Sequence, residues 1–382
     1  MKNAIKNFFK NWTPFKKRYF PIFVSMSISF IISLILIFTL PAITNSSLFG
    51  NKNKTSKSGW PIRISAPYID MSGWVDPANA YSNGGAPNLL KLADDSGFEY
   101  FNLGFIQPDS TTPLNENGTI RWGWGGYYQL SKYAPANAQY NGIVQSLKEL
   151  RDNGGDYTIS IGGQLGDAPW VVTQSQTTLE TFYKDIIETY DLKRMDLDIE
   201  ESNQNAYQNG INAKAIKTVQ DETGVEITLT IPIMPSGWQE KQLAVINAYL
   251  DAGVDIHLIN SMTMCYGTGV YENEDYGTAS VRAISNSINQ IKTLYANHGQ
   301  TLTTDQAYLK TGATFSIGYE NELYPVFTLA MANTIVDDAI KHNYGMVSMW
   351  SMGRDAMLKA NQAITTPFNY SNVLHRYDED IK

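Results

Sequence analysis

Cysteine and histidine are scarce in this chain. Cys265 is the single cysteine among 382 residues, so the chain cannot form an internal disulfide or a cysteine-based metal cage. The four histidines are scattered and form no HExxH pair; they are His257, His298, His342 and His375. We therefore expect no metal ion and no nucleotide cofactor.

Acidic residues are missing from the first part of the sequence. None precedes Asp70, whereas residues 1–18 carry six Lys or Arg side chains. From residue 58 onward the balance reverses, with 20 basic side chains against 37 acidic ones. Because phosphate contacts need clustered Lys and Arg, this acidic body argues against nucleic acid as a partner.

Charge is absent altogether from residues 19–40, a run of 22 residues that matches the length needed to span a bilayer. The basic residues before it predict a cytoplasmic N-terminus and an exported body. A signal peptide is the alternative, because small residues follow, although its apolar region usually has only about 7–15 residues. We therefore predict a basic cytoplasmic segment (1–18) and a transmembrane anchor or signal peptide (19–44), with the body extracytoplasmic, either anchored to the membrane or secreted.

The rest of the chain divides into three parts. Residues 45–59 are polar and lack hydrophobic periodicity, which predicts a flexible linker. Residues 60–370 form the body, and residues 371–382 read as a polar C-terminal tail.

The body alternates between two kinds of pattern. Its eight strand-like runs are residues 63–71, 99–106, 156–163, 194–200, 226–233, 256–266, 309–319 and 345–350. Stretches with helical spacing separate them, for example Ile143, Leu147 and Leu150. Eight such alternations predict an α/β fold, a (β/α)8 TIM barrel that makes a single catalytic domain.

The fourth run, "RMDLDIEES", carries Asp196, Asp198 and Glu200 at every second position. In a strand these three side chains leave from one face, with neighbours roughly 6.5–7 Å apart. Active sites of such barrels lie where strands end, and Glu200 ends this run. Three like charges in a confined mouth raise at least one pKa, which favours a proton donor. A structural set of acids or an oxygen-ligand metal site is the alternative that spacing alone leaves open.

Several segments together resemble family 18 glycoside hydrolases, the chitinases and endo-β-N-acetylglucosaminidases. "MDLDIE" resembles their DGxDxDxE signature, and "SIGG" at Ser160–Gly163 resembles their SxGG signature. The segments "NSMTMCYG" and "MWSMGRD" resemble the ends of the sixth and eighth strands of that family. "APYIDM", "LTIPIMPSG" and "PVFTLAMA" resemble segments of one bacterial chitinase subgroup, and all of these segments occur in the expected order.

This resemblance implies a retaining, substrate-assisted hydrolysis of β-1,4-linked N-acetylglucosamine polymers, such as chitin or chitooligosaccharides. Glu200 is then the acid and later the base. Asp198 orients the acetamido group of the sugar, and Asp196 shares a proton with Asp198. Ser160, Gly162 and Gly163 are expected to support the neighbouring strand rather than touch substrate.

The resemblance also suggests residues that bind the sugar. Trp350 is expected as an apolar floor, and Tyr266, with its neighbours Met264 and Cys265, is expected near the reacting sugar. Trp122 and Trp124 lie in the Gly-rich stretch "RWGWGGYY" and are expected to stack on sugar faces. For Trp350, Tyr266, Trp122 and Trp124, packing in the core is the competing interpretation.

The sequence departs from the family at two places. Lys193 and Arg194 replace the leading Asp-Gly of the long signature, and Cys265 stands where an Asp is usual. A thiol cannot supply the same charged acceptor, which favours one alternative, a chitinase-like lectin that binds glycan without cutting it. A second alternative is an endo-β-N-acetylglucosaminidase that acts on N-glycan or cell-wall sugars by the same mechanism.

Overall fold

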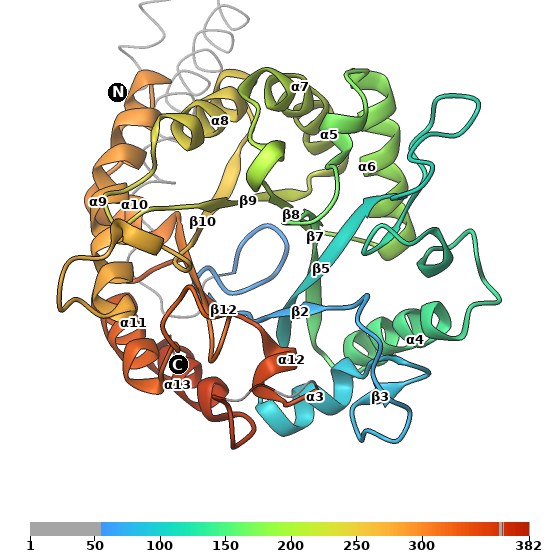
Figure 1. The fold of residues 1–382 in the computed structure, drawn as a ribbon. Helices are drawn as coiled ribbons and strands as arrows, with labels where there is room; N and C mark the ends of the chain where they lie inside the picture. The colour runs from blue at the N-terminus through green and yellow to red at the C-terminus, as the bar shows by residue number, and fades with distance from the viewer. Residues whose placement is uncertain (1–54, 359–360, 362, 382) are drawn as a thin grey trace, which may run out of the picture. The chain divides into compact units, whose positions relative to one another are not determined.

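A closed parallel sheet forms the core of the computed structural model, which describes residues 55–358, 361 and 363–381 (Figure 1). The barrel strands are β2 (Tyr68–Asp70), β5 (Tyr100–Pro108), β7 (Asp156–Gly162), β8 (Arg194–Asp198), β9 (Glu226–Pro232), β10 (Ile256–Met262), β11 (Thr311–Ser316) and β12 (Met346–Trp350). Each pairs in parallel with the next, and β12 closes the ring by pairing Trp350 with Tyr68. The predicted (β/α)8 barrel is confirmed.

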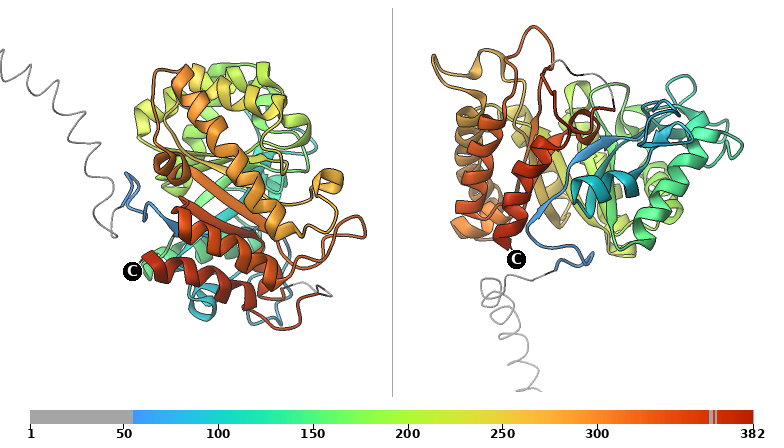
Figure 2. Two further views of the ribbon diagram at one scale, coloured as in Figure 1. Left: turned by 90° about the vertical axis from the view of Figure 1, so that its left-hand side faces the viewer. Right: turned by 90° about the horizontal axis from the view of Figure 1, so that it is seen from below.

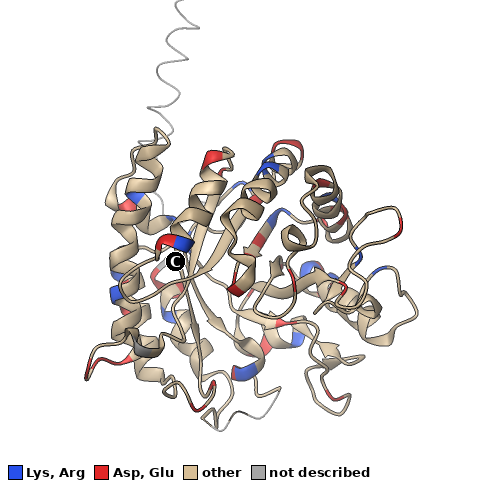
Figure 3. Ribbon diagram, turned by 45° about the horizontal axis from the view of Figure 1, so that its top comes forward, with Lys and Arg blue, Asp and Glu red and all other residues tan. Residues whose placement is uncertain are grey.

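Helices surround this sheet (Figures 1 and 2). They are α3 (Leu89–Ser96), α4 (Ala138–Asp152), α5 (Pro169–Val172), α6 (Gln176–Tyr190), α7 (Ala206–Thr223), α8 (Glu240–Asp251), α9 (Tyr276–Asn297), α10 (Thr304–Leu309), α11 (Leu329–His342), α12 (Met352–Asp355) and α13 (Asn369–Ile381). Short 3-10 turns follow several strands; these are η1 (Tyr128–Leu130), η2 (Glu201–Asn203) and η3 (Gly267–Gly269). Acidic and basic positions are interspersed on the outer helices (Figure 3).

Helix α4 shows how the sequence sets these elements. The side chain of Asn137 accepts a hydrogen bond from the Tyr140 amide and so caps the first turn. Ile143, Leu147 and Leu150, spaced at one helical face, are all buried. The apolar residues whose spacing predicted a helix therefore form the face of α4 that packs on the core.

Four short strands of the described residues lie outside the ring of eight or extend it. β1 (Ile64–Ser65) pairs in parallel with β12. The strands β3 (Ser82–Asn83) and β4 (Ala86–Pro87) form a small antiparallel hairpin before α3. A further strand, β6 (Trp122–Trp124), pairs antiparallel with β5 in the long connection to β7.

The N-terminal end of the barrel is held by a buried ion pair. Arg194 and Glu226, at the starts of β8 and β9, lie 2.9 Å apart. Ser58 donates a hydrogen bond of 2.8 Å to the Glu226 carboxylate, and the Arg194 guanidinium lies over the Trp60 ring. The end of the predicted flexible linker is therefore attached to the barrel, because its polar side chains satisfy these buried charges. For Arg194, a departure from the family signature, this is a structural role.

The C-terminal segment corrects another expectation. Instead of a polar tail, residues 371–382 belong largely to α13, which packs against α11 (Figure 2). Leu374 and Tyr377 are completely buried there. The charged residues between them obscured this apolar face in the sequence.

The predicted anchor or signal segment, residues 19–44, lies outside the described residues. The first ten residues of the 45–59 linker do as well. Among the helices within residues 55–381 that the structure describes, none has the length and apolar character of a bilayer span.

Candidate active site

Strand β8 carries the acidic set in the alternation that the sequence predicts. Met195, Leu197 and Ile199 are fully buried on one face of the strand. Asp196 and Asp198 leave from the other face, and Glu200 lies two residues beyond Asp198, the last residue of β8. Because the ends of parallel strands meet at one rim, this places Glu200 at the mouth of the barrel.

Asp196 lies at the centre of a hydrogen-bond network inside the barrel. Its carboxylate accepts hydrogen bonds from the hydroxyls of Tyr68 (2.8 Å), Ser160 (2.7 Å) and Thr230 (2.7 Å). The Asn260 amide donates in turn to Tyr68 and Thr230. Burial raises the pKa of Asp196 to about 6, while the three hydroxyls favour its ionised form and limit the rise.

The environment of Asp198 differs from that of Asp196, because hydrogen-bond donors are lacking around one of its oxygens. Its side chain is buried, and Oδ1 has no hydrogen-bond partner among the described residues. Burial, together with the negative charges of Glu200 and Asp196, raises the pKa of Asp198 well above its usual value. A buried carboxyl that lacks donors is most stable in its neutral form. Burial therefore favours the neutral form of Asp198, whereas the three donated hydrogen bonds favour the ionised form of Asp196.

Glu200 is only partly buried, as a group at the rim should be. Burial and the charge of the adjacent Glu201 raise the pKa of Glu200 to about 7. A carboxylic acid with such a pKa can donate a proton near neutral pH and take it back afterwards. The three acids thus occupy three environments and have three different proton affinities.

Glycine is required beside this strand. The Gly163 amide donates to the Asp198 carbonyl (3.1 Å), and a Cβ on Gly162 would lie 2.1 Å from that same oxygen. Gly162 also has φ +115, where side chains are strained. Ser160 contacts Asp196 rather than the open mouth. The "SIGG" segment therefore supports β8, as predicted.

Trp350 lies at the end of β12, in register with Ser316 on one side and Tyr68 on the other. Its ring stacks on Phe105 with centroids 5.5 Å apart. Trp350 is partly exposed and lines a cavity of about 220 Å³. The position is compatible with the predicted floor of the site.

Cys265 lies at the same rim and is exposed. Desolvation and the nearby charges of Glu320 and Glu200 raise the pKa of the thiol to about 11, against the effect of Arg354. Arg354 donates hydrogen bonds to Glu320 (2.6 Å) and to Ser316 (2.8 Å). Cys265 is therefore an uncharged group beside a fixed ion pair.

The prediction that Tyr266 binds substrate does not agree with the position of its side chain. Its side chain is buried, and its hydroxyl shares a hydrogen bond of 3.0 Å with Ser280. Strand β10 ends at Met262, and Cys265, beyond that end, has φ +54, a left-handed conformation. The alternation of a strand therefore does not predict the direction of the Tyr266 side chain. Met264, just before Cys265, is partly buried.

The prediction for Trp122 and Trp124 is wrong as well. Both belong to β6 and are at most 1% exposed. Their indole N–H groups donate to Asp185 (2.9 Å) and to the hydroxyl of Tyr190 (3.0 Å). These rings pack the long β5–β7 connection onto α6, so neither presents a face to a sugar.

Several residues at the mouth were missed. Trp74 is 58% exposed and lines the cavity beside Trp350, together with Asp70 and Arg354. Tyr68 and Asp70 lie in the segment "APYIDM", whose resemblance to chitinases was the available signal. Trp74 is a single aromatic residue in a loop without periodicity, so the sequence contained no signal for its role.

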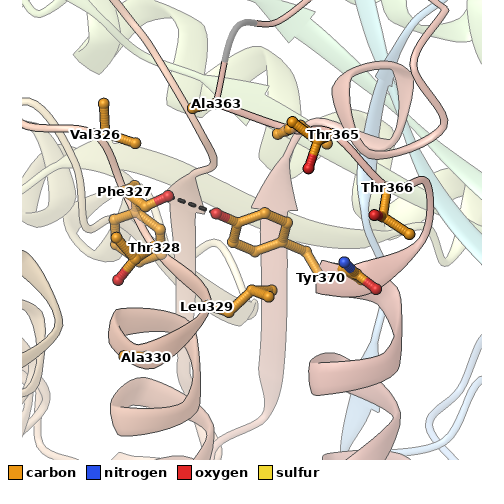
Figure 4. A pocket seen from close by; sticks show the side chains of 11 residues that line it. Val326, Phe327, Thr328, Leu329, Ala330, Ala363, Thr365, Thr366 and Tyr370 are labelled. Atoms are coloured by element: carbon orange, nitrogen blue, oxygen red, sulfur yellow. Dashed lines mark hydrogen bonds between the residues drawn. The ribbon is translucent and has the colours of Figure 1, made fainter.

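Other candidate sites on the described residues carry less chemistry. A cavity of about 350 Å³ lies between the starts of α11 and α13, where the Tyr370 hydroxyl donates to the Phe327 carbonyl (Figure 4). Its lining contains no carboxyl, imidazole or thiol group. Within the described residues, no group of three His, Cys, Asp or Glu side chains is arranged to hold a metal ion.

Comparison with known proteins agrees with this geometry. A probable bifunctional chitinase/lysozyme of Escherichia coli is 31% identical over 316 residues, which are 79% of this chain and 32% of that protein. Endochitinase 11 of Metarhizium anisopliae is 30% identical over 316 residues, covering 79% of this chain and 54% of its own length. The catalytic domain of a hyperthermophilic chitinase from Pyrococcus furiosus aligns with a TM-score of 0.68 and 25% identity, over 84% of this chain and 96% of that domain. No family model matches the chain.

The chain therefore spans about a third to a half of the length of these two curated relatives. Its resemblance to chitinases, read first from short motifs, is confirmed in sequence and in fold.

Proposed function

We propose that this chitinase homologue, whose motifs are those of family 18 glycoside hydrolases, cleaves β-1,4-linked N-acetylglucosamine chains by a retaining, substrate-assisted mechanism. One observation supports this most directly. Asp198 is a buried carboxyl with an unpartnered oxygen and a raised pKa, and it lies between the hydrogen-bonded Asp196 and the rim acid Glu200 along the chain. An acidic cluster built only for stability would satisfy that oxygen.

In the first step the acetamido carbonyl oxygen of the sugar attacks its own anomeric carbon. Glu200 gives its proton to the glycosidic oxygen, the C–O bond breaks, and the leaving sugar departs as an alcohol. The acetamido group becomes a positively charged oxazolinium ring. Its N–H points at Asp198, whose carboxylate form stabilises that charge.

Asp198 can ionise in this step because Asp196 can take its proton. The Tyr68 and Thr230 hydroxyls lie 2.9 Å apart, and either can be the donor. Their hydrogens can therefore reorient when Asp196 becomes neutral and needs fewer donors. The network can therefore accommodate Asp196 in either protonation state.

In the second step the Glu200 carboxylate takes a proton from water. The resulting hydroxide attacks the anomeric carbon from the face that the leaving sugar vacated, opposite the acetamido oxygen. The bond between that oxygen and the anomeric carbon breaks, which restores the N-acetyl group. Two displacements at one carbon give net retention of configuration. No covalent bond to the enzyme forms in either step.

The pH profile tests the assignment of protons. We expect kcat/KM on a fluorogenic chitobioside to be highest between about pH 6 and pH 7. Above about pH 7 it should fall tenfold per unit because Glu200 loses the proton that it must donate. Below about pH 6 it should fall because Asp196 is already protonated and cannot accept the proton of Asp198.

Glu201→Gln is the matched variant for this profile. The negative charge at Glu201 raises the pKa of Glu200, so removing it should move the alkaline limb to lower pH and leave the acid limb in place. An alkaline limb that does not move, or moves upward, would assign it to another group.

Cys265→Ala should change kcat/KM by less than about threefold. With a pKa of about 11 the thiol is uncharged at neutral pH and supplies no ionic contact. Cys265→Asp is the companion variant, because its carboxylate would add a charge beside Glu320 and Glu200. Turnover should be measured on chitooligosaccharides for both variants. A loss of tenfold or more in the alanine variant would give the sulfur a direct role.

The parent chain should also be assayed against peptidoglycan and against N-glycan cores. Binding of chitooligosaccharide without release of product, at any pH between 4 and 8, would favour a lectin over the enzyme.

A further inference from the structure

Glu320 is an acid at the barrel mouth that has no role in the mechanism. It lies four residues beyond Ser316, the last residue of β11, and Cys265 lies three residues beyond the end of the neighbouring strand β10. Because the ends of parallel strands meet at one rim, both residues belong to the same part of the mouth. After desolvation, the Glu320 charge is the largest influence that raises the pKa of the Cys265 thiol, ahead of Glu200.

Two donors hold Glu320 in its ionised form. The Ser316 hydroxyl and Arg354 Nη1 both donate to Oε2, the second over 2.6 Å. Burial alone would raise the pKa of Glu320, but these hydrogen bonds outweigh burial, and the pKa is lowered. Within the described residues no group donates to Oε1, and the side chain is 30% exposed. One oxygen of an ionised carboxylate, which can only accept, is therefore accessible to a ligand.

A purely structural ion pair is the alternative role for Glu320. Arg354 also donates to the Ile317 carbonyl (3.3 Å), so it fixes the loop after β11 to α12. An arginine that serves only to hold a carboxylate often uses two nitrogens for its two oxygens. Here Nη1 alone serves Ser316, Ile317 and Glu320, and it leaves Oε1 without a donor from the described residues. This arrangement fixes the carboxylate and keeps one acceptor accessible.

Position 265 is where this chain has a thiol in place of the usual acid of the family signature. The thiol is uncharged and cannot accept as a carboxylate does. We propose that Glu320 supplies, from the end of the neighbouring strand, the carboxylate that position 265 lacks, and that its Oε1 accepts a hydrogen bond from a hydroxyl group of the sugar unit being cleaved. This inference rests on the proposed function and adds a binding residue to it.

The first test replaces Glu320 with glutamine in the full-length chain. The amide keeps an oxygen for Ser316 and Arg354 but removes the charged acceptor. We expect kcat/KM on chitotetraose to fall about tenfold, mainly through a higher KM, because the lost hydrogen bond is present in the bound substrate and in the transition state alike. Glu322→Gln is the matched control. Glu322 is exposed in the same loop, so its kcat/KM should stay within about twofold of the parent value.

Cys265→Asp separates a binding role from a structural one. Added to Glu320→Gln, it places a carboxylate at position 265 and should return kcat/KM to within about threefold of the parent value. The double variant should unfold at the same temperature as Glu320→Gln, because the repair concerns the substrate and not the fold. In the parent chain, Cys265→Asp should give no gain in kcat/KM, because a second carboxylate then lies beside the first.

Three results would overturn the assignment of Glu320. They are a Glu320→Gln chain as active as Glu322→Gln, a double variant no faster than Glu320→Gln, and a tenfold gain from Cys265→Asp in the parent chain. The last result would mean that the parent lacks a charge which Glu320 does not supply, and it requires no substitution at Glu320.

Failure of the proposed function is recognised separately. A parent chain that binds chitooligosaccharides without cleaving them would contradict the hydrolysis but not the binding role of Glu320. Calorimetric Kd values of the same variants should then follow the pattern expected for KM, with a tenfold rise in Glu320→Gln and recovery in the double variant. A parent chain that neither binds nor cleaves these sugars would overturn both.

Discussion

Replacing Glu200 with glutamine is expected to lower kcat on chitooligosaccharides by about a thousandfold and to leave their binding nearly intact. The amide has the shape of the acid but can neither give a proton to the glycosidic oxygen nor take one from water. Initial rates with chitotetraose and calorimetric titration of the same variant measure the two effects. A variant that keeps more than a tenth of the parent rate would remove Glu200 from the reaction.

Glu201→Gln serves as the matched control for this experiment. Glu201 is exposed and adjacent, so the same chemical change is made one residue further along the chain. Its kcat at the optimum pH should stay within about threefold of the parent value, because Glu201 acts only through the pKa of its neighbour.

The Glu200→Gln substitution should also stabilise the fold at alkaline pH. The pKa of Glu200 is about 7 in the folded chain and about 4.5 when unperturbed. A raised pKa means that ionisation is unfavourable in the folded state, so stability falls as the pH rises from about 4.5 to 7. Glutamine avoids this cost. Denaturant unfolding should show a gain of roughly 3 kcal/mol at pH 8 and almost none at pH 4.

How far the sequence predicts this site depends on whether a residue follows a local rule. In "RMDLDIE" the period of two is strict, and it correctly predicts a strand that carries Asp196 and Asp198; the strand ends at Asp198, two residues before Glu200. The barrel follows from eight such runs separated by helical spacing. These features are set by neighbours in the chain, so the sequence displays them directly.

The residues that the sequence misassigned depend on distant partners. Trp122 and Trp124 lie among glycines, and only the pairing of β6 with β5 buries them. Tyr266 lies beyond the end of β10 and is buried against Ser280 of α9, a contact between segments that the local sequence pattern does not predict. Trp74 becomes part of a cleft because the hairpin glycine Gly85 supports it. None of these contacts has a periodic signal.

Asp198→Asn should reduce kcat by at least about a hundredfold while leaving the fold at least as stable as the parent at pH 6, because the raised pKa of Asp198 costs stability that the amide does not. An asparagine has nearly the shape of the protonated acid, and the buried Oδ1 of Asp198 has no partner to lose. The amide cannot become the anion that offsets the oxazolinium charge, so the cost appears only in the transition state. Chitotetraose hydrolysis and denaturant unfolding measure the two properties.

Asp196→Asn provides the contrast, because Asp196 has the opposite environment. Three hydroxyls donate to its two oxygens, and an amide offers one oxygen and places N–H groups against a donor. Its unfolding free energy should therefore fall by about 1–3 kcal/mol. If Asp198→Asn loses as much stability as Asp196→Asn, Asp198 is a structural residue. If the Asp198→Asn variant keeps more than a tenth of the parent kcat, the carboxyl of Asp198 does not hold the acetamido group.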